Sequence, residues 1–154
     1  MIRFAIAAFT LGLVACSPPG TPVVPESEAK PVLSYTDAFV MEPIGERDMT
    51  VGGVTVSVEG GDVRLIAASS DDADTIEIHT MSMEDGRMRM RQVDGFDIAD
   101  GETLELKRGG NHFMVFGVSE NVIAGETVDM TLVFKTGEEE LVLVVEADVR
   151  AVGE

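Results

Sequence analysis

Short stretches in which apolar and polar residues alternate fill most of this chain, and glycine-containing turns separate them. In the first stretch Val54, Val56 and Val58 fall on one side, and Gly60-Gly61 follows. A repeat of two residues is the pattern of a half-buried strand, and no stretch repeats convincingly with the period of a helix. At least seven such stretches follow one another, which predicts an all-β fold, an antiparallel β-sandwich. The expected strands are 51–58, 63–67, 75–83, 104–107, 112–118, 128–135 and 141–149.

The dipeptide Asp-Gly at positions 85–86 is typical of a two-residue hairpin turn. Around such a turn, Met81 faces Met90 across the two strands. His79 then lies diagonal to Met90 on the same face, within reach of long side chains. The hairpin therefore brings an imidazole and a thioether towards each other.

The opposite face of the first hairpin strand carries Ile76 and Ile78, so His79 points away from the core. We therefore expect a site at the rim of the sandwich, partly exposed to solvent. Arg89 and Arg91 would share the face of Ile78. Two charged side chains do not belong in a core, which predicts that the second hairpin strand twists or leaves the sheet there.

The N-terminus has the pattern of a bacterial lipoprotein signal. Arg3 supplies a positive charge, and residues 4–13 form an apolar run that is too short to span a bilayer, which needs about 20 apolar residues. The run ends in Leu-Val-Ala-Cys at 13–16, which resembles a lipobox. Cys16, the single cysteine of the chain, is therefore the expected lipidation site.

Three segments follow from this interpretation. Residues 1–15 are the signal peptide, residues 16–31 are the acylated cysteine and a Pro-rich flexible tether, and residues 32–154 are the folded domain. The expected location is the cell envelope, with the domain facing the periplasm and held to the membrane by the lipid anchor alone. Ser17 after the lipidated cysteine favours the outer membrane.

Charge and cysteine content exclude several classes of protein. The formal net charge is −17 and is spread along the chain, which argues against nucleic acid and anionic lipid head groups as partners. Once Cys16 is acylated no thiol remains, so disulfides, thiol redox pairs and thiolate metal ligands are excluded. A soft-metal site would have to be built without cysteine.

Both histidines of the chain have methionines nearby. His79 shares the hairpin with Met90, while His112 and Met114 are two residues apart and so lie on one face of another strand. Imidazole nitrogen and thioether sulfur are neutral donors, and the soft thioether suits Cu(I), whereas Zn²⁺ prefers thiolate, imidazole or carboxylate and hard cations prefer oxygen. These four residues are the candidate ligands.

Methionine is more often a filler of hydrophobic cores than a ligand, and the chain has nine. We expect Met130 and Met49 in the core, while Met41 has no expected place. The remaining hairpin methionines are as compatible with packing as with a surface position beside the site or a role as spare ligands. They are Met81, Met83 and Met88.

The spacing of the four candidates carries a family resemblance. Ten residues separate His79 from Met90, twenty-one separate Met90 from His112, and one separates His112 from Met114. This resembles, without departure, the His-x10-Met-x21-His-x-Met signature of the PCu(A)C family of periplasmic copper chaperones. The resemblance covers about 34–149. Similar neighbouring segments are 76–79, 82–86, 88–91, 109–114, 124–127 and 132–134.

The resemblance implies a cupredoxin-like sandwich that binds copper and performs no catalysis. Matched residue by residue, His79, Met90, His112 and Met114 become the ligands of one Cu(I), with Cu(II) left open as a further bound form. The implied role is to supply the dinuclear copper centre of cytochrome c oxidase. The implied partners are a copper-accepting oxidase subunit or a thiol-containing copper assembly factor, and we expect a monomer.

Two departures from the family concern the scaffold or the partner surface. Phe39 stands where a Trp is usual, and the turn at 59–61 is Glu-Gly-Gly where an Asn-rich turn is usual. Neither departure touches the four candidate ligands.

Other functions remain open alternatives. A copper buffer or resistance protein without a dedicated acceptor would use the same ligands. A copper enzyme is disfavoured because such sites often need three histidines or an N-terminal histidine, and a blue-copper carrier is disfavoured because it requires a cysteine thiolate. A metal-free structural sandwich would bind no copper at all.

Overall fold

The computed structural model describes residues 30–153, so the expected signal peptide, Cys16 and most of the expected tether lie outside the described residues. The described part contains ten strands and no helix, which confirms the all-β prediction. Accordingly, residues 30–153 hold no helix with the length and hydrophobicity needed to span a bilayer. The strands are β1 (Val32–Met41), β2 (Met49–Glu59), β3 (Val63–Ser69), β4 (Thr75–Glu84), β5 (Arg87–Gln92), β6 (Phe96–Ile98), β7 (Thr103–Leu106), β8 (His112–Phe116), β9 (Thr127–Thr136) and β10 (Glu139–Arg150).

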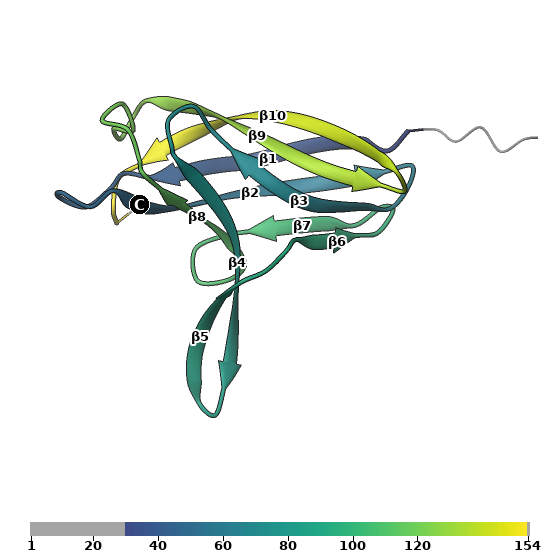
Figure 1. Cartoon of the computed structure of the whole chain (residues 1–154), viewed down its shortest axis with the longest axis horizontal. Helices are drawn as coiled ribbons and strands as arrows, with labels where there is room; N and C mark the ends of the chain where they lie inside the picture. The colour runs from purple at the N-terminus through teal and green to yellow at the C-terminus, as the bar shows by residue number, and fades with distance from the viewer. Residues whose placement is uncertain (1–29, 154) are drawn as a thin grey trace, which may run out of the picture.

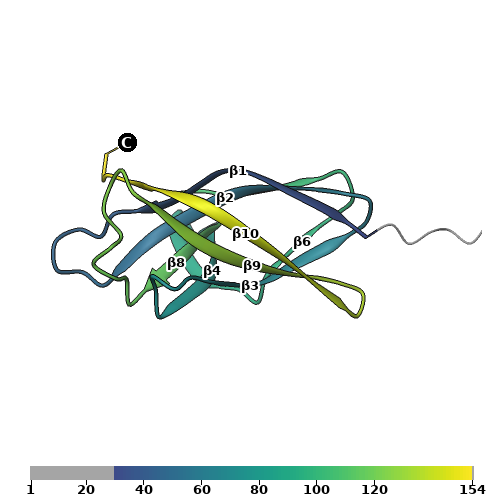
Figure 2. The same cartoon turned by 90° about the horizontal axis from the view of Figure 1, so that it is seen from above.

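The strands form one sheet that curls until it closes on itself. Its order is β5-β4-β8-β2-β1-β10-β9-β3-β6, with β7 added to β2, and β3 also pairs with β4 through Ala68 and Ile76. The long strands β1, β2, β9 and β10 run along the long axis of the molecule (Figure 1; Figure 2). The result is a sandwich whose sheet is closed by the β3–β4 pairing, and β4 and β8 are neighbouring strands in it.

The strand β1 is one that the sequence pattern did not predict. Its alternation is interrupted by a bulge, because its register with β2 shifts between Thr36 and Phe39 and Asp37 has a φ of 52°. After the bulge β1 also pairs with β10, and this pair is parallel in a described sheet that is otherwise antiparallel. The predicted antiparallel sandwich is therefore correct except for this one pair.

The core lies between the two walls of the closed sheet. Val54, Val56 and Val58 of β2 are buried, as their alternation predicts. Met130 is also buried among core residues, which confirms its prediction. Met49 was expected in the core, but its side chain is 41% exposed, so that prediction is wrong. The reason is its position at the start of β2, where it pairs with Phe116 on the face that points away from the core residues.

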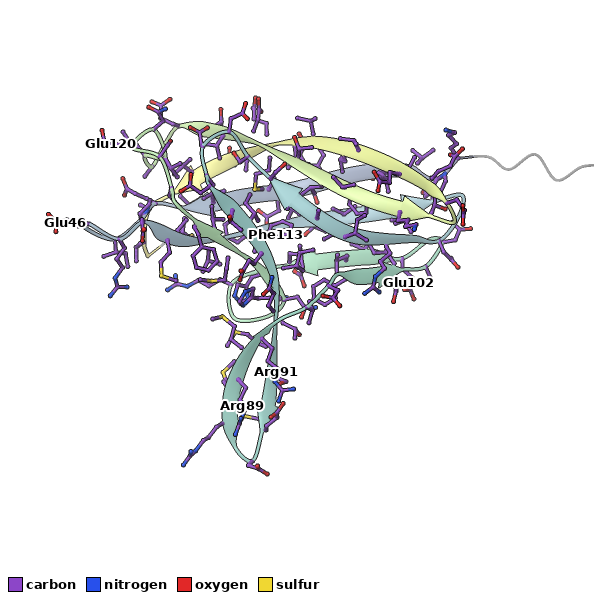
Figure 3. All side chains as sticks on the ribbon, viewed as in Figure 1. Glu46, Arg89, Arg91, Glu102, Phe113 and Glu120 are labelled. Atoms are coloured by element: carbon purple, nitrogen blue, oxygen red, sulfur yellow. The ribbon has the colours of Figure 1, made fainter. Side chains whose placement is uncertain are left out.

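The hairpin of β4 and β5 projects away from the body of the sandwich (Figure 1). All residues of β5 are exposed, and its ladder pairs only with β4. Arg89 and Arg91 lie in this projecting part and both pair with Glu84 (Figure 3). The second hairpin strand was expected to twist or leave the sheet; β5 instead stays paired with β4 as the edge strand of the sheet but projects with it from the body. Its arginines reach solvent because β5 is exposed along its whole length.

Candidate functional site

The two histidines lie side by side where β4 and β8 pair. His79 and His112 are direct cross-strand partners, and their ring centroids are 5.8 Å apart with the rings tilted by 39°. Both side chains are buried. The neighbouring residues Ile78 and Phe113 point into the core, and this anchors the two strands and fixes the histidines on the opposite face.

Backbone and loop contacts orient His112. Its Nδ1 lies 2.7 Å from the carbonyl oxygen of Gly110, and because a carbonyl oxygen only accepts, Nδ1–H is the donor. The neutral ring then carries a free lone pair on Nε2. The loop before β8 is held to β4 by the hydroxyl of Thr80, which donates to the side-chain oxygen of Asn111 at 2.8 Å.

Met90 brings its sulfur to the free nitrogen of His112. The distance between Sδ of Met90 and Nε2 of His112 is 3.2 Å. A thioether has no proton to donate, and in the neutral imidazole ring Nε2 carries none when Nδ1 does. Two lone-pair donors therefore converge without a hydrogen between them, which is the arrangement of two ligands around a soft metal ion.

Glu77 orients His79 in a corresponding way. Its carboxylate lies 2.8 Å from Nε2 of His79, so Nε2–H donates and the lone pair resides on Nδ1. That Nδ1 is the one buried side-chain nitrogen or oxygen of residues 30–153 without a hydrogen-bond partner. A buried polar atom without a partner is costly, so a ligand to it would remove that cost.

Met114 lies on β8 two residues after His112. It is on the same side of β8 as His112, directly opposite Glu77 of β4. Its side chain borders a cavity of about 220 Å³, together with Met41, Met49 and Arg108 among others. Met114 is therefore adjacent to the histidine pair, and the cavity gives access to it from the side of the β1–β2 loop.

The prediction of a partly exposed site at the rim is correct for one of the four candidate ligands and wrong for the other three. His79, His112 and Met114 are 9%, 3% and 6% exposed, whereas Met90 is 49% exposed. The loop before β8 contacts His112 through the Gly110 carbonyl, and Arg108 and residues of the β1–β2 segment line the cavity beside Met114. Because Met90 comes from the projecting hairpin, it alone of the four is open to solvent.

The structure thus brings His79, His112 and Met90 together and places Met114 beside them. Sequence reasoning missed Glu77 and Gly110 as orienting groups. Glu77 could have been found, since residues two apart on a strand share a face, but a backbone carbonyl leaves no signal in the sequence. Residues 30–153 contain no cluster of three or more His, Cys, Asp and Glu side chains with the geometry of a metal site.

Solved structures share this fold. The copper-bound PCuAC domain of PmoF2 matches with a TM-score of 0.63 and 19% identity, covering 77% of this chain and 92% of that domain. The solution structure of CuI-DR1885 from Deinococcus radiodurans matches with a TM-score of 0.60 and 28% identity, covering 76% of this chain and 77% of that protein. The cupredoxin-like sandwich that the PCu(A)C resemblance implies is therefore confirmed.

Sequence comparison leads to the family. A protein of Leifsonia xyli subsp. xyli named "Putative lipoprotein Lxx21020" is 29% identical over 135 residues, which is 86% of this chain and 80% of that protein. The model of the family described as "Putative lipoprotein LpqE-like" matches residues 33–146, from the start of β1 to near the end of β10. This chain, with its PCuAC-type fold, belongs to the LpqE-like lipoprotein family.

Proposed function

We propose that this protein binds one Cu(I) through His79, Met90, His112 and Met114 and passes it to another protein. The observation that carries the proposal is the 3.2 Å approach of Met90 Sδ to Nε2 of His112, the ring nitrogen that does not face the Gly110 carbonyl. The unpartnered Nδ1 of His79 in the adjacent strand supports it, because it is a second nitrogen with a lone pair to donate. Copper in the solved structures of PmoF2 and DR1885 is further support.

The ligand set suits a metal that must be released. Two imidazoles and two thioethers are neutral, so they hold Cu(I) without the strong attraction of thiolates. Met90 is 49% exposed and belongs to the projecting hairpin, so an incoming thiolate can displace it first. The buried histidines keep the ion bound until that exchange is under way.

Copper binding is tested by competition with a chromogenic Cu(I) chelator. We expect a stoichiometry of one for the parent chain, with His112→Ala and Met90→Leu weakening binding. Met130→Leu is the matched control, because this methionine lies in the hydrophobic core and a change from Met to Leu nearly conserves its volume. X-ray absorption of the Cu(I) form should show sulfur scattering at thioether distance, and a shell of only nitrogen and oxygen would refute the proposal.

The proposed acceptor of the Cu(I) is the dinuclear copper centre of cytochrome c oxidase. A mixture of the Cu(I)-loaded protein and the metal-free, soluble copper domain of that oxidase should transfer copper without denaturant. Retention of copper by this protein, with normal binding otherwise, would favour a copper buffer or resistance protein.

The anchor proposed at Cys16 would keep the domain at the periplasmic side of the cell envelope, with the outer membrane favoured. The family description as lipoproteins supports this location. The full chain expressed in a bacterial host should be found with membranes, and Cys16→Ser should release it to the soluble fraction. Equal partitioning of the two forms would contradict lipidation.

A further inference from the structure

Four methionines lie on one face of the projecting β4–β5 hairpin, and the two nearest its tip, Met83 and Met88, pack against no core residue. Met83 is 67% exposed and Met88 is 57% exposed. Neither belongs to the hydrophobic core or to the residues packed against it. Sulfur atoms are visible along this hairpin, away from the body of the sandwich (Figure 3). Core filling, the common use of methionine, therefore does not account for them.

The register of the hairpin brings these methionines close together. Met83 is the direct cross-strand partner of Met88, and Met81 is the partner of Met90. The turn at 85–86 is two residues long, and both residues have positive φ, 49° and 74°, as in a type I′ turn. This turn makes the pair that flanks it hydrogen-bonded.

Hydrogen-bonded and non-hydrogen-bonded pairs alternate along an antiparallel ladder. The end of the hairpin away from the turn fits the same alternation, because Val93 N–H donates to the carbonyl of Ile78 at 2.9 Å and so makes this pair hydrogen-bonded. Met83–Met88 and Met81–Met90 are therefore non-hydrogen-bonded pairs, in which the Cα atoms are about 4.5 Å apart and the side chains are closest. Long thioether side chains on such pairs can meet at one point.

Near its tip, the hairpin carries its arginines and Glu84 on the face opposite to Met81, Met83 and Met88. There Glu84 pairs with Arg89 at 3.3 Å and with Arg91 at 2.5 Å. The guanidinium groups are thus paired with a carboxylate on the face away from the sulfur atoms. A monovalent cation on the methionine face meets no unpaired arginine there, and the net charge of the protein, −17, attracts it.

We propose that Met81, Met83 and Met88 form a second, weaker Cu(I) site made of thioethers alone. Three soft, neutral sulfur donors fit Cu(I) or Ag(I) and discriminate against Zn²⁺ and hard cations. Met90 is the cross-strand partner of Met81 and contacts His112, so it adjoins both this site and the histidine pair. The second site does not require the histidine site, and it would receive or release the ion at the exposed end of the hairpin.

The test is a titration of the full chain with Ag(I), a redox-inert probe for Cu(I), followed by NMR of ¹³C-labelled methionine methyl groups. We expect the Met90 and Met114 methyls to shift during the first equivalent. The methyls of Met83, Met88 and Met81 should shift only with the second. Met83→Leu with Met88→Leu should abolish the second event and leave the first unchanged, and Met130→Leu, a change in the core, should change neither.

Each other result has a distinct meaning. Saturation at one equivalent with no shift of Met83 and Met88 would overturn the second site. A shift of these two within the first equivalent would also overturn it, because they would then belong to a single site. Shifts of Met83 and Met88 without any at Met90 and Met114 would support the second site and refute the proposed histidine site.

Discussion

Nε2 of His112 and Sδ of Met90 lie 3.2 Å apart, although β8 and β5 do not pair with each other. Both strands flank β4, so the contact reaches across the strand that carries His79. The hydrogen bond from Nδ1 of His112 to the Gly110 carbonyl determines which nitrogen faces the sulfur. Two ligands from separate strands are thus oriented before any metal arrives.

The difference in exposure between Met90 and Met114 predicts different costs of mutation. Met90→Leu should change the free energy of unfolding by less than about 0.5 kcal/mol, as is usual at exposed positions. Met114→Ala should cost about 2–4 kcal/mol, because it empties a buried position. Both should weaken Cu(I) binding. Urea unfolding of the apo proteins measures the difference, and equal stabilities of the two variants would contradict the burial of Met114.

Replacing Glu77 should weaken copper binding although it is no ligand. Its carboxylate accepts from Nε2–H of His79 and so keeps the lone pair on Nδ1. Loss of such an orienting partner typically costs 10- to 100-fold in metal affinity. We expect Glu77→Ala to lose about tenfold or more and Glu77→Gln, whose amide oxygen can still accept, to lose less. An unchanged affinity of Glu77→Ala in a chelator competition would refute this role.

Copper should slow hydrogen exchange in the hairpin. In the apo protein β5 is exposed throughout and pairs only with β4, so its amides should exchange by local opening. Ligation by Met90 and His112 would join β5 to β8 and resist that opening. Mass spectrometry of exchange with and without Cu(I) tests this, with the peptide covering β9 as the control. Equal exchange in β5 would argue against Met90 as a ligand.

Gly53 should not tolerate a side chain. A Cβ there would lie 2.2 Å from the carbonyl oxygen of Leu106 and 2.7 Å from the ring of Phe39. Gly53→Ala should therefore destabilise the domain by at least about 1–3 kcal/mol through overpacking. Gly110→Ala is the control, since its Cβ would meet Lys107 at 3.6 Å, an ordinary contact. A thermal melt that leaves Gly53→Ala within a degree of the parent would contradict this close packing.

Local patterns in the sequence were sufficient for the hairpin and for most of the strands, although β1 and β6 were not predicted. A strand repeats every two residues, so alternation alone separated the core face of Ile78 from the site face of His79. The dipeptide at 85–86 set the turn, and the turn set the pairing of Met81 with Met90, as the structure confirms. These features depend only on residues close together in the chain.

Burial and the closure of the sheet were decided by tertiary structure. The pairing of His79 with His112 joins strands that are far apart in the chain, and the burial of Met114 depends on the β1–β2 segment that folds over it. The hydrogen bonds from the histidines to Glu77 and Gly110, which select the tautomer of each ring, likewise form only in the folded structure. Alternation tells which face a side chain takes, but what covers that face is decided by segments that come together only when the chain folds.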